Sequence, residues 1–298
     1  MIYSCNKCQI MTSQAILLTR SDKVTTTDPT TQVLIGPGPV LLTLNAKGVG
    51  ELTLNTPETA NCLNNEMLIA MSAALMVCHG ESRLRVLILK GAGKNFCAGG
   101  DIKTFTAEGD NLPFYIRQAT LHLKTVVNSM IRLQVPVIVS VQGFAAGGGG
   151  FGFVCAADVV IAADSASFLA GATRVGMSPD AGMSVTLQNL VGFRQAMHIL
   201  LTNPVISAQE ALELGILTQV VAKDQLDEKT RVYAENLAQG ATLALGQTKR
   251  LLWNGMGSQV EAILDDESRT VASLSGTKDS MEAMYAILEK REARFSGQ

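Results

Sequence analysis

The sequence of 298 residues has no run of 18 or more apolar residues, and its first ten residues hold no long apolar stretch. A membrane-spanning helix needs about 20 such residues and a secretory signal needs an apolar core, so neither is indicated. The charges nearly balance, with 24 Lys and Arg against 26 Asp and Glu. The chain therefore lacks the basic field of a nucleic-acid-binding protein. We expect a cytoplasmic protein that binds neither nucleic acid nor membrane.

A disulfide framework and a metal site are also missing. The six cysteines are spread along the chain in mostly apolar surroundings, which is typical of buried free thiols. Cys5 and Cys8 form a lone Cys-x-x-Cys pair with no two further ligands nearby, so a frayed tail is a better interpretation than zinc binding. His79, His122 and His198 have no acidic or cysteine partner at metal-ligand spacing. We expect no metal ligand set.

What the chain does contain is enough apolar material for a large core, with 47% hydrophobic residues. Residues 1–37 are rich in Ser and Thr without apolar periodicity, which predicts a poorly ordered extension. Two β-type runs at 40–44 and 50–55 predict a hairpin. A helix is expected at 64–78, with Asn64 as its cap.

Further strands and helices alternate along the chain up to Pro179. Nearly continuous apolar runs predict strands at 84–89, 135–141 and 159–163, and a long helix is expected at 113–133. This alternation predicts an α/β protein with a parallel sheet covered on both faces. Helices are then expected at 180–191, 194–201, 208–214, 225–238, 243–253, 258–273 and 278–290.

A glycine run, QGFAAGGGGFGFVCAAD at 142–158, follows the expected strand at 135–141. Without Cβ atoms, its backbone N–H groups can approach an anionic ligand, although a tight packing turn explains the run equally well. A second glycine-rich loop at 91–101 follows the strand at 84–89. If the two strands are parallel neighbours, both loops lie at one sheet edge. Two N–H groups aimed at one point there would form an oxyanion hole, which contributes about 2.7 to 4 kcal/mol per donor.

Five segments resemble the successive motifs of the crotonase, or enoyl-CoA hydratase/isomerase, superfamily. They are NTPETANCLN at 55–64, NFCAGGDI at 95–102, PVIVSVQGFAAGGG at 136–149, ADVVIAADSASF at 157–168 and GMSPDAG at 176–182. The similarity runs from about residue 38 to the C-terminus. It implies a spiral of ββα units at 38–225 and a helical C-terminal region at 226–298 that covers the site and forms trimers.

The resemblance also implies a ligand. The substrate would be an acyl-CoA thioester bound by a homotrimer or homohexamer, and no cofactor is expected because coenzyme A is part of the substrate. The thioester oxygen would be held by the N–H groups of Gly100 and Gly148. The substrate-binding positions would be Ala60, Ala98, Asp101, Ile102, Lys103, Phe151 and Lys249. Lys249 would reach the CoA phosphates of a neighbouring subunit; the alternative is an ordinary exposed helix lysine.

The family's reactions differ in their acids and bases. A hydratase of this family uses two glutamates to handle one water, and the matching positions here are Phe151 or Gly152 and Ala172. None of these is acidic, which argues against ordinary hydration. Asp180 matches the proton-moving aspartate of the isomerase branch that includes 1,2-epoxyphenylacetyl-CoA isomerase. The sequence thus favours an isomerase that shifts the double bond of a 3-enoyl-CoA to the 2-position, with Asp180 as the proton shuttle.

Several other interpretations stay open. Asp180 could be a residue of the first helical turn, with Ser178 as cap and Pro179 at the first helical position. The chain could also be a hydratase, a dehalogenase that uses Asp180 as a nucleophile, or a non-catalytic acyl-CoA binder. Asp101 is expected to cap a helix. The run at 265–267, Asp-Asp-Glu, is expected to be solvated charge.

Overall fold

The computed structural model describes residues 31–298, apart from the side chains of residues 257 and 258. Residues 1–30, with Cys5, Cys8 and most of the expected extension, lie outside this range. The next residues correct that expectation. They form strand β1 (Gln32–Ile35), which pairs with the following strand. The strand contains the apolar residues Val33, Leu34 and Ile35, whose side chains favour β-structure. The run is short and follows polar residues, so the sequence pattern did not predict a strand.

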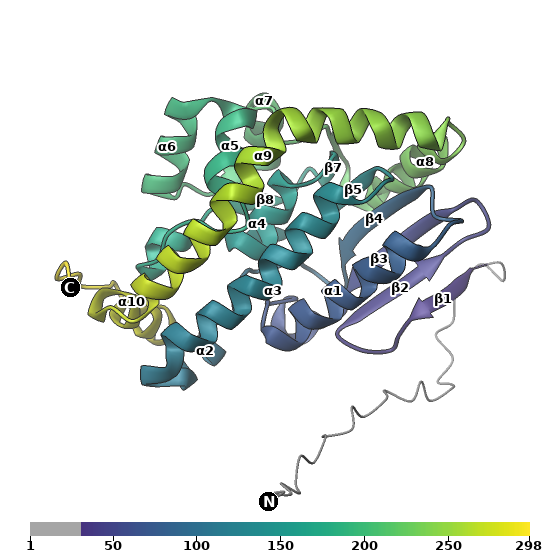
Figure 1. Cartoon of the computed structure of the whole chain (residues 1–298). Coiled ribbons are helices and arrows are strands. Elements are labelled where there is room, and N and C mark those ends of the chain that lie inside the picture. The colour runs from purple at the N-terminus through teal and green to yellow at the C-terminus, as the bar shows by residue number, and fades with distance from the viewer. Residues whose placement is uncertain (1–30) are drawn as a thin grey trace, which may run out of the picture.

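A seven-stranded mixed sheet is the centre of the fold (Figure 1). Its strands lie in the order β1, β2 (Val40–Leu44), β3 (Val49–Leu54), β4 (Val86–Gly91), β5 (Val137–Val141), β7 (Val159–Ala163) and β10 (Gln219–Val221). The first three are antiparallel, which confirms the expected hairpin, and β3 to β10 run parallel. A second sheet holds β6 (Phe144–Ala146), β8 (Ser167–Leu169) and β9 (Ile206–Ser207).

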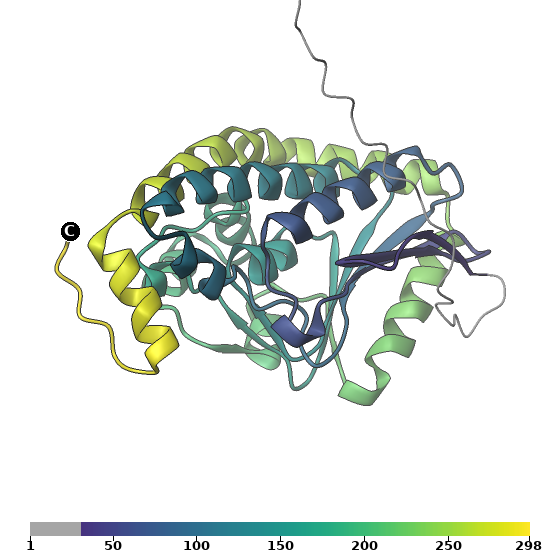
Figure 2. The ribbon, with the colours of Figure 1, turned by 90° about the horizontal axis from the view of Figure 1, so that it is seen from below.

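Helices cover both faces of the large sheet. The helices of the described residues are α1 (Asn65–Gly80), α2 (Ile102–Glu108), α3 (Leu112–Arg132), α4 (Gly147–Cys155), α5 (Met183–Val191), α6 (Phe193–Thr202), α7 (Ala208–Glu213), α8 (Leu226–Ala238), α9 (Thr242–Ser275) and α10 (Lys278–Glu289). Short 3₁₀ turns are η1 (Pro57–Thr59), η2 (Gly109–Asn111), η3 (Ala172–Val175) and η4 (Lys223–Gln225). Figure 2 shows α1, α3 and α9 side by side along one face and α8 on the other.

Local sequence explains why α1 forms. Asn64 is its cap and accepts a hydrogen bond from the N–H of Met67 at 2.9 Å, as expected. Met67, Met71, Leu75 and Cys78 recur at helical spacing, and all four are buried. Burial of this stripe holds the helix on the sheet.

Helix α9 corrects a second expectation, because 243–253 and 258–273 belong to one helix of 34 residues. Glycines within the segment lower its helical propensity, but contacts along α3 hold it. Arg132 of α3 pairs with Glu261, and Lys124 pairs with Asp265. At Gly246 the helix passes close to the carbonyl of Gln134, where a Cβ would come within 2.1 Å of the oxygen. Tertiary packing overrides local propensity here.

Lys249 is the third correction, since it is neither exposed nor free to reach a CoA phosphate. It is 6% exposed, and its Nζ lies 2.8 Å from Asp158 Oδ2 and 2.8 Å from the Met130 carbonyl oxygen. Asp158 also accepts from Val137 N–H and Trp253 Nε1. Burial lowers the pKa of Lys249, against the charge of Asp158. This pair fastens α9 to the end of the sheet.

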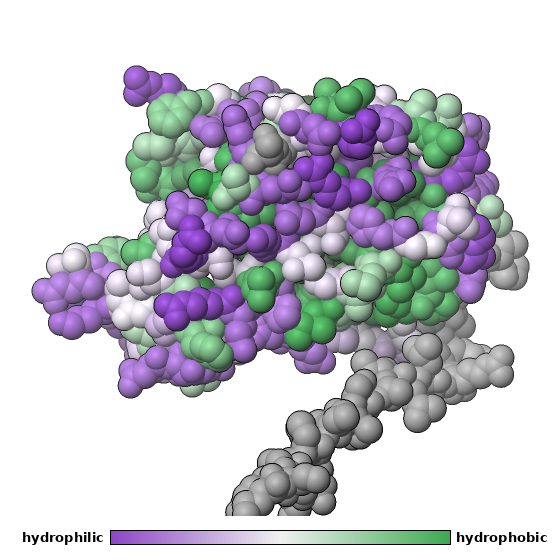
Figure 3. Space-filling view, in the orientation of Figure 1, coloured by the Kyte–Doolittle hydropathy of each residue, from purple (hydrophilic) through white to green (hydrophobic). Residues whose placement is uncertain are grey.

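The surface carries exposed apolar side chains. The large ones on two helices are Phe193, Met197 and Leu201 on α6 and Leu243, Leu251 and Leu252 on α9. Figure 3 shows hydrophobic residues on one face gathered in separate patches among hydrophilic ones. The expected homotrimer or homohexamer would be one way to cover such residues, and the assembly stays a prediction. In the described part of the chain, no helix is long and apolar enough to cross a membrane.

Replacing Lys249 by Ala should lower the free energy of unfolding by about 3 kcal/mol, because it leaves the Asp158 carboxylate buried without its cation. Urea denaturation measures the change. Arg250→Ala is the matched control, since Arg250 is exposed on the next position of α9 and should cost within about 0.5 kcal/mol. Equal stability of the two variants would show that the buried pair contributes nothing.

Candidate active site

Two loops meet at the carboxyl ends of β4 and β5, as the sequence predicts for parallel neighbours. Cys97 N–H donates to the Phe144 carbonyl at 3.1 Å, and Ala146 N–H donates to the Cys97 carbonyl at 2.9 Å. This is a parallel bridge between Cys97 and Ala145. Gly100 and Gly148 each follow their bridged residue by three positions. The bridge therefore places the two glycines at matching positions in the two loops.

Gly100 and Gly148 both line one cavity of about 940 Å³. Within residues 31–298, neither N–H group donates to another backbone group. Gly148 is in the first turn of α4, where helix N–H groups lack internal partners and the helix dipole favours negative charge. The two loops also touch, because a Cβ on Gly147 would lie 4.0 Å from Gly100 N. The arrangement suits two donors that share one acceptor.

Asp180 lies directly against Gly148. A Cβ added at Gly148 would come within 1.6 Å of Asp180 Oδ1, so only a bare Cα leaves room for the carboxylate. The alternative placing of Asp180 in a first helical turn is wrong, because α5 begins at Met183 with Gly182 as its N-cap. Ser178 caps no helix, and its hydroxyl is buried without a partner among the described residues. Asp180 thus belongs to the loop before the helix.

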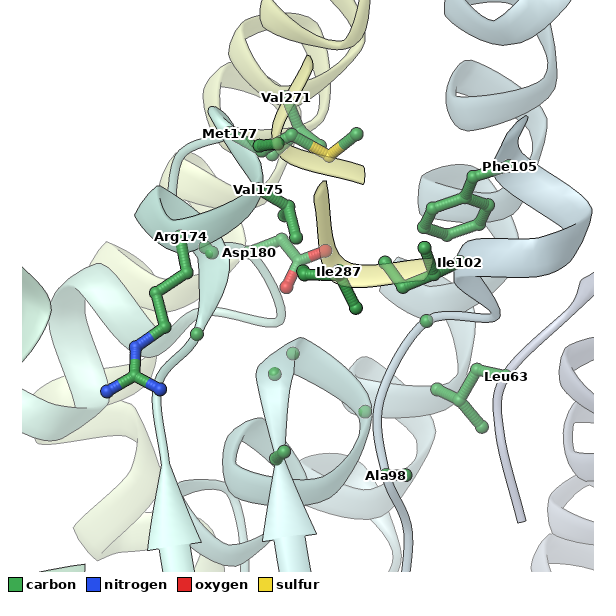
Figure 4. Close-up of a pocket in the computed structure, with 18 of the residues that line it drawn as sticks. Leu63, Ala98, Ile102, Phe105, Arg174, Val175, Met177, Asp180, Val271 and Ile287 are labelled. Atoms are coloured by element: carbon green, nitrogen blue, oxygen red, sulfur yellow. The ribbon is translucent and has the colours of Figure 1, made fainter. Parts of the chain in front are cut away.

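Burial sets the protonation of Asp180. Burial raises the pKa of Asp180 to about 7, and the negative charge of Glu267 adds to the rise. Figure 4 shows the carboxylate pointing into the cavity, with Ile102, Val175 and Ile287 around it. The Arg174 guanidinium points away from it. A carboxylate whose pKa lies near neutrality can both take up and release a proton.

Apolar side chains form most of the cavity wall. Phe105 of α2 and Leu123 of α3 line one part, while Ile287 of α10 and Phe295 of the tail line another. The C-terminal segment therefore covers the site within the same chain. Hydrogen bonds from Ser296 and Gly297 to Asp279 fasten the tail to the start of α10. Such a wall suits an apolar acyl group.

The predicted substrate-binding residues fall into different places. Ala98 and Ile102 line the cavity. Ala60 does not, but its carbonyl accepts from Ala98 N–H at 3.1 Å and supports the loop. Asp101 caps α2, as expected, through the N–H groups at positions 103 and 104. Lys103 is exposed beside this loop, and its contact with CoA stays a prediction.

The positions that match the two hydratase glutamates lie in α4 and η3. Phe151 is fully buried, packs on Phe168 with ring centroids 6.0 Å apart, and does not line the cavity, which corrects its predicted role in substrate binding. Gly152 shares a face of α4 with Gly148, and a Cβ there would lie 2.6 Å from Ala181 Cβ. Ala172 does line the cavity, with a methyl group only. Among the described residues, the carboxylates that line the cavity are those of Asp180 and the exposed Glu292.

Glu267 is the residue that sequence reasoning missed. It was expected to be solvated charge, yet it is 6% exposed and accepts hydrogen bonds from the N–H groups of Gly182 and Ser184. A signal was present in the sequence. Val260, Leu264, Glu267 and Val271 recur at helical spacing, and all four are buried. A carboxylate on an apolar stripe needs a partner across the interface.

Cys97, inside the first loop, is an inert thiol. It is fully buried, and burial raises its pKa to about 12, so the thiolate is absent at neutral pH. This agrees with the expectation that position 97 needs a small apolar side chain and no nucleophile.

Comparisons with known proteins identify similar sequences. The family model described as enoyl-CoA hydratase/isomerase matches residues 45–298. A "probable enoyl-CoA hydratase" of Rhodobacter capsulatus is 35% identical over 252 residues, which cover 85% of this chain and 96% of the relative. The 1,2-epoxyphenylacetyl-CoA isomerase of Escherichia coli is 33% identical over 253 residues, which cover 84% of this chain and 96% of the relative.

Solved structures share the fold. The crystal structure of an enoyl-CoA hydratase from Mycobacterium avium subsp. paratuberculosis matches with a TM-score of 0.79 at 26% identity. The match covers 87% of this chain and 99% of that chain. The predicted crotonase-like α/β fold with a helical C-terminal region is confirmed.

Replacing Asp180 by Asn should change stability in a pH-dependent way. The folded pKa of about 7 exceeds the ordinary value of about 3.9, so the folded wild type binds more protons than the unfolded chain between these values. Wild-type stability relative to the variant should therefore fall by about 2 to 4 kcal/mol as the pH rises from 4 to 8. Denaturation at both pH values measures this. The exposed Asp110→Asn is the control, and a pH-independent difference for Asp180→Asn would contradict the raised pKa.

Proposed function

Because the chain belongs to the enoyl-CoA hydratase/isomerase family, we propose that it is an isomerase that converts 3-enoyl-CoA or a related unsaturated acyl-CoA to 2-enoyl-CoA. One observation carries the proposal. Asp180 is a half-buried carboxylate placed against Gly148, while the positions of the two hydratase glutamates hold Phe151 or Gly152 and Ala172. Hydration needs two groups to orient and deprotonate a water, whereas a double-bond shift needs one group that moves a proton.

The proposed reaction begins with removal of a proton from C2 of the substrate by the Asp180 carboxylate. The electron pair of the broken C–H bond spreads over the double bond and onto the thioester oxygen, which gives a dienolate. The N–H groups of Gly100 and Gly148 donate to this oxygen, and they bind it more strongly as its negative charge grows. Asp180 then returns the proton at C4, and the double bond becomes conjugated with the carbonyl. No water and no second base are consumed.

The pKa of Asp180 near 7 supports this cycle. An ordinary aspartate is a weak base toward a carbon acid, and a strongly raised pKa improves its basicity while leaving a useful ionised fraction at neutral pH. The same value makes the protonated form a ready acid for the second step. The apolar cavity wall also keeps the negative charge of the dienolate away from bulk water.

Asp180→Asn should lower isomerase turnover of a 3-enoyl-CoA by about 100-fold or more, because general acid–base groups typically contribute that much. Absorbance of the conjugated 2-enoyl thioester measures the rate. Asp110→Asn again serves as the exposed control and should keep its rate. Loss of less than about tenfold in Asp180→Asn would exclude general-base catalysis by this residue.

Isotope labelling separates isomerisation from hydration. Hydration is the activity that the name of the Rhodobacter capsulatus relative suggests. In water labelled with oxygen-18 we expect product without the label, because no water is added. In heavy water we expect deuterium at C2 or C4, since the proton on Asp180 can exchange before it returns. Oxygen-18 at C3 would instead identify a hydratase. A covalent adduct on Asp180 would identify nucleophilic attack, and binding without any isotope uptake would identify a non-catalytic binder.

A further inference from the structure

A second carboxylate lies behind the loop that carries Asp180. Glu267 accepts from Gly182 N–H at 2.7 Å, from Ser184 N–H at 3.1 Å and from the Ser184 hydroxyl. These donors belong to the N-terminal turn of α5, whose N-cap Gly182 has no side chain to satisfy them. Glu267 therefore caps α5 from another helix, α9, at a point two residues beyond Asp180.

The loop between Asp180 and α5 is strained and needs such a support. Ala181 has a φ of 57° and Gly182 a φ of 76°, so two successive residues are in the left-handed region. For a residue with a Cβ this conformation costs roughly 1 to 2 kcal/mol. It persists only where the surroundings fix it. Glu267 holds the loop from one side, and Gly152 of α4, which meets the Ala181 methyl group, holds it from the other.

We propose that Glu267 is a positioning residue for Asp180: its carboxylate fixes the strained loop through Gly182 and Ser184 and keeps a negative charge behind the Asp180 carboxyl group. The inference rests on the proposed isomerase function only where it concerns catalysis. Its structural part, which concerns the placing and protonation of Asp180, is independent of the reaction.

The donors decide which carboxylate holds the charge. Two N–H groups and one hydroxyl group donate to Glu267. Among the described residues, the one donor to the Asp180 side chain is the N–H group of Asp180 itself. Hydrogen bonds to a carboxylate favour its charged form. Burial raises the pKa of both groups, but the proton should bind first to Asp180 as the pH falls. Glu267 then keeps its charge while Asp180 titrates near neutrality.

The arginines around the site are paired with groups other than Asp180. Arg174 of η3 donates to the Asn203 carbonyl, and Arg291 of the tail pairs with Glu282 and Glu289. Glu292 of the tail is exposed at the cavity wall. Helices α4 and α5 contain no acidic, lysine, arginine or histidine residue. On the α3 side of α9, the cations pair with other carboxylates, Lys124 with Asp265 and Arg132 with Glu261. The charge that faces Asp180 from α9 is that of Glu267.

The test is a titration of the Asp180 carboxyl group in protein labelled with carbon-13 aspartate. Infrared spectroscopy follows the band of the protonated carboxyl, and Asp180→Asn identifies that band by its loss. We expect a midpoint near pH 7 in the wild type. In Glu267→Gln the midpoint should fall by about one pH unit, because the neighbouring negative charge is gone. The acidic limb of the pH–rate profile should move by the same amount.

Asp266→Asn is the matched control, since it removes one negative charge from the adjacent, exposed position of α9. Its midpoint and rate should equal those of the wild type. An unchanged Asp180 midpoint in folded Glu267→Gln would overturn the proposal. A variant that loses stability and rate equally at every pH, with no shift of the midpoint, would show a purely structural role and would also overturn it.

Ser184→Ala is the second variant, for the case that Glu267→Gln does not fold. It removes only the hydroxyl donor, after which Glu267 is protonated more readily or draws back from the loop. Both responses weaken the charge behind Asp180, so the midpoint should fall by less than one unit, and an unchanged midpoint would contradict the proposal.

The outcome of this titration is separate from that of the experiments on the proposed function. If the isotope experiments excluded the isomerase reaction, the infrared shift would still be expected. If the infrared shift were absent, the isotope results would still stand.

Discussion

The contact between Asp180 and the bare Cα of Gly148 is the constraint on which the site depends. In the proposed reaction an oxyanion donor and a proton-moving group act on atoms of one small substrate, so they must lie within a few ångströms of each other. A side chain of any size at Gly148 would occupy the position of Asp180 Oδ1. The parallel bridge between Cys97 and Ala145 then sets where Gly148 can be, because it ties the loop after β5 to the loop after β4. Gly100 is carried to the same cavity by the same bridge.

This placement has an electrostatic cost that the rest of the fold must offset. A carboxylate with a pKa near 7 is destabilised in its charged form, and the negative charge of Glu267 adds to that cost. An isolated Asp in such a place would favour a loop that swings it toward water. The apolar packing of Met177 and Met183, the Ala181 contact with Gly152 and the cap that Glu267 gives to α5 together prevent this. Strain and charge are thus concentrated where chemistry needs a reactive group.

The sequence predicts the frame of this site well because the frame rests on local signals. The apolar runs of β4, β5 and β7, the Asn64 cap and the two glycine loops each have a pattern that is readable within a few residues. Gly100, Gly148 and Asp180 were chosen by the resemblance of their motifs to the family, and in the structure all three line one cavity. Boundaries that depend on distant contacts were wrong. The start of α5 lies at Met183 because Glu267 caps it from α9, and α9 is continuous because α3 supports it.

The sequence also failed to predict where two single charged residues, Lys249 and Glu267, lie. Each lies on α9, was expected at the surface or at a neighbouring subunit, and is buried against a partner far away in the sequence. A helix of 34 residues is about 50 Å long, so α9 reaches from the end of the sheet to the loop that carries Asp180. Lys249 binds Asp158 at the sheet, and Glu267 binds Gly182 and Ser184 at the loop. A slip of α9 along its axis would leave both charges buried without partners, which costs several kcal/mol each. The two contacts therefore fix the register of α9, and through it the distance between the sheet that carries the glycine loops and the loop that carries Asp180.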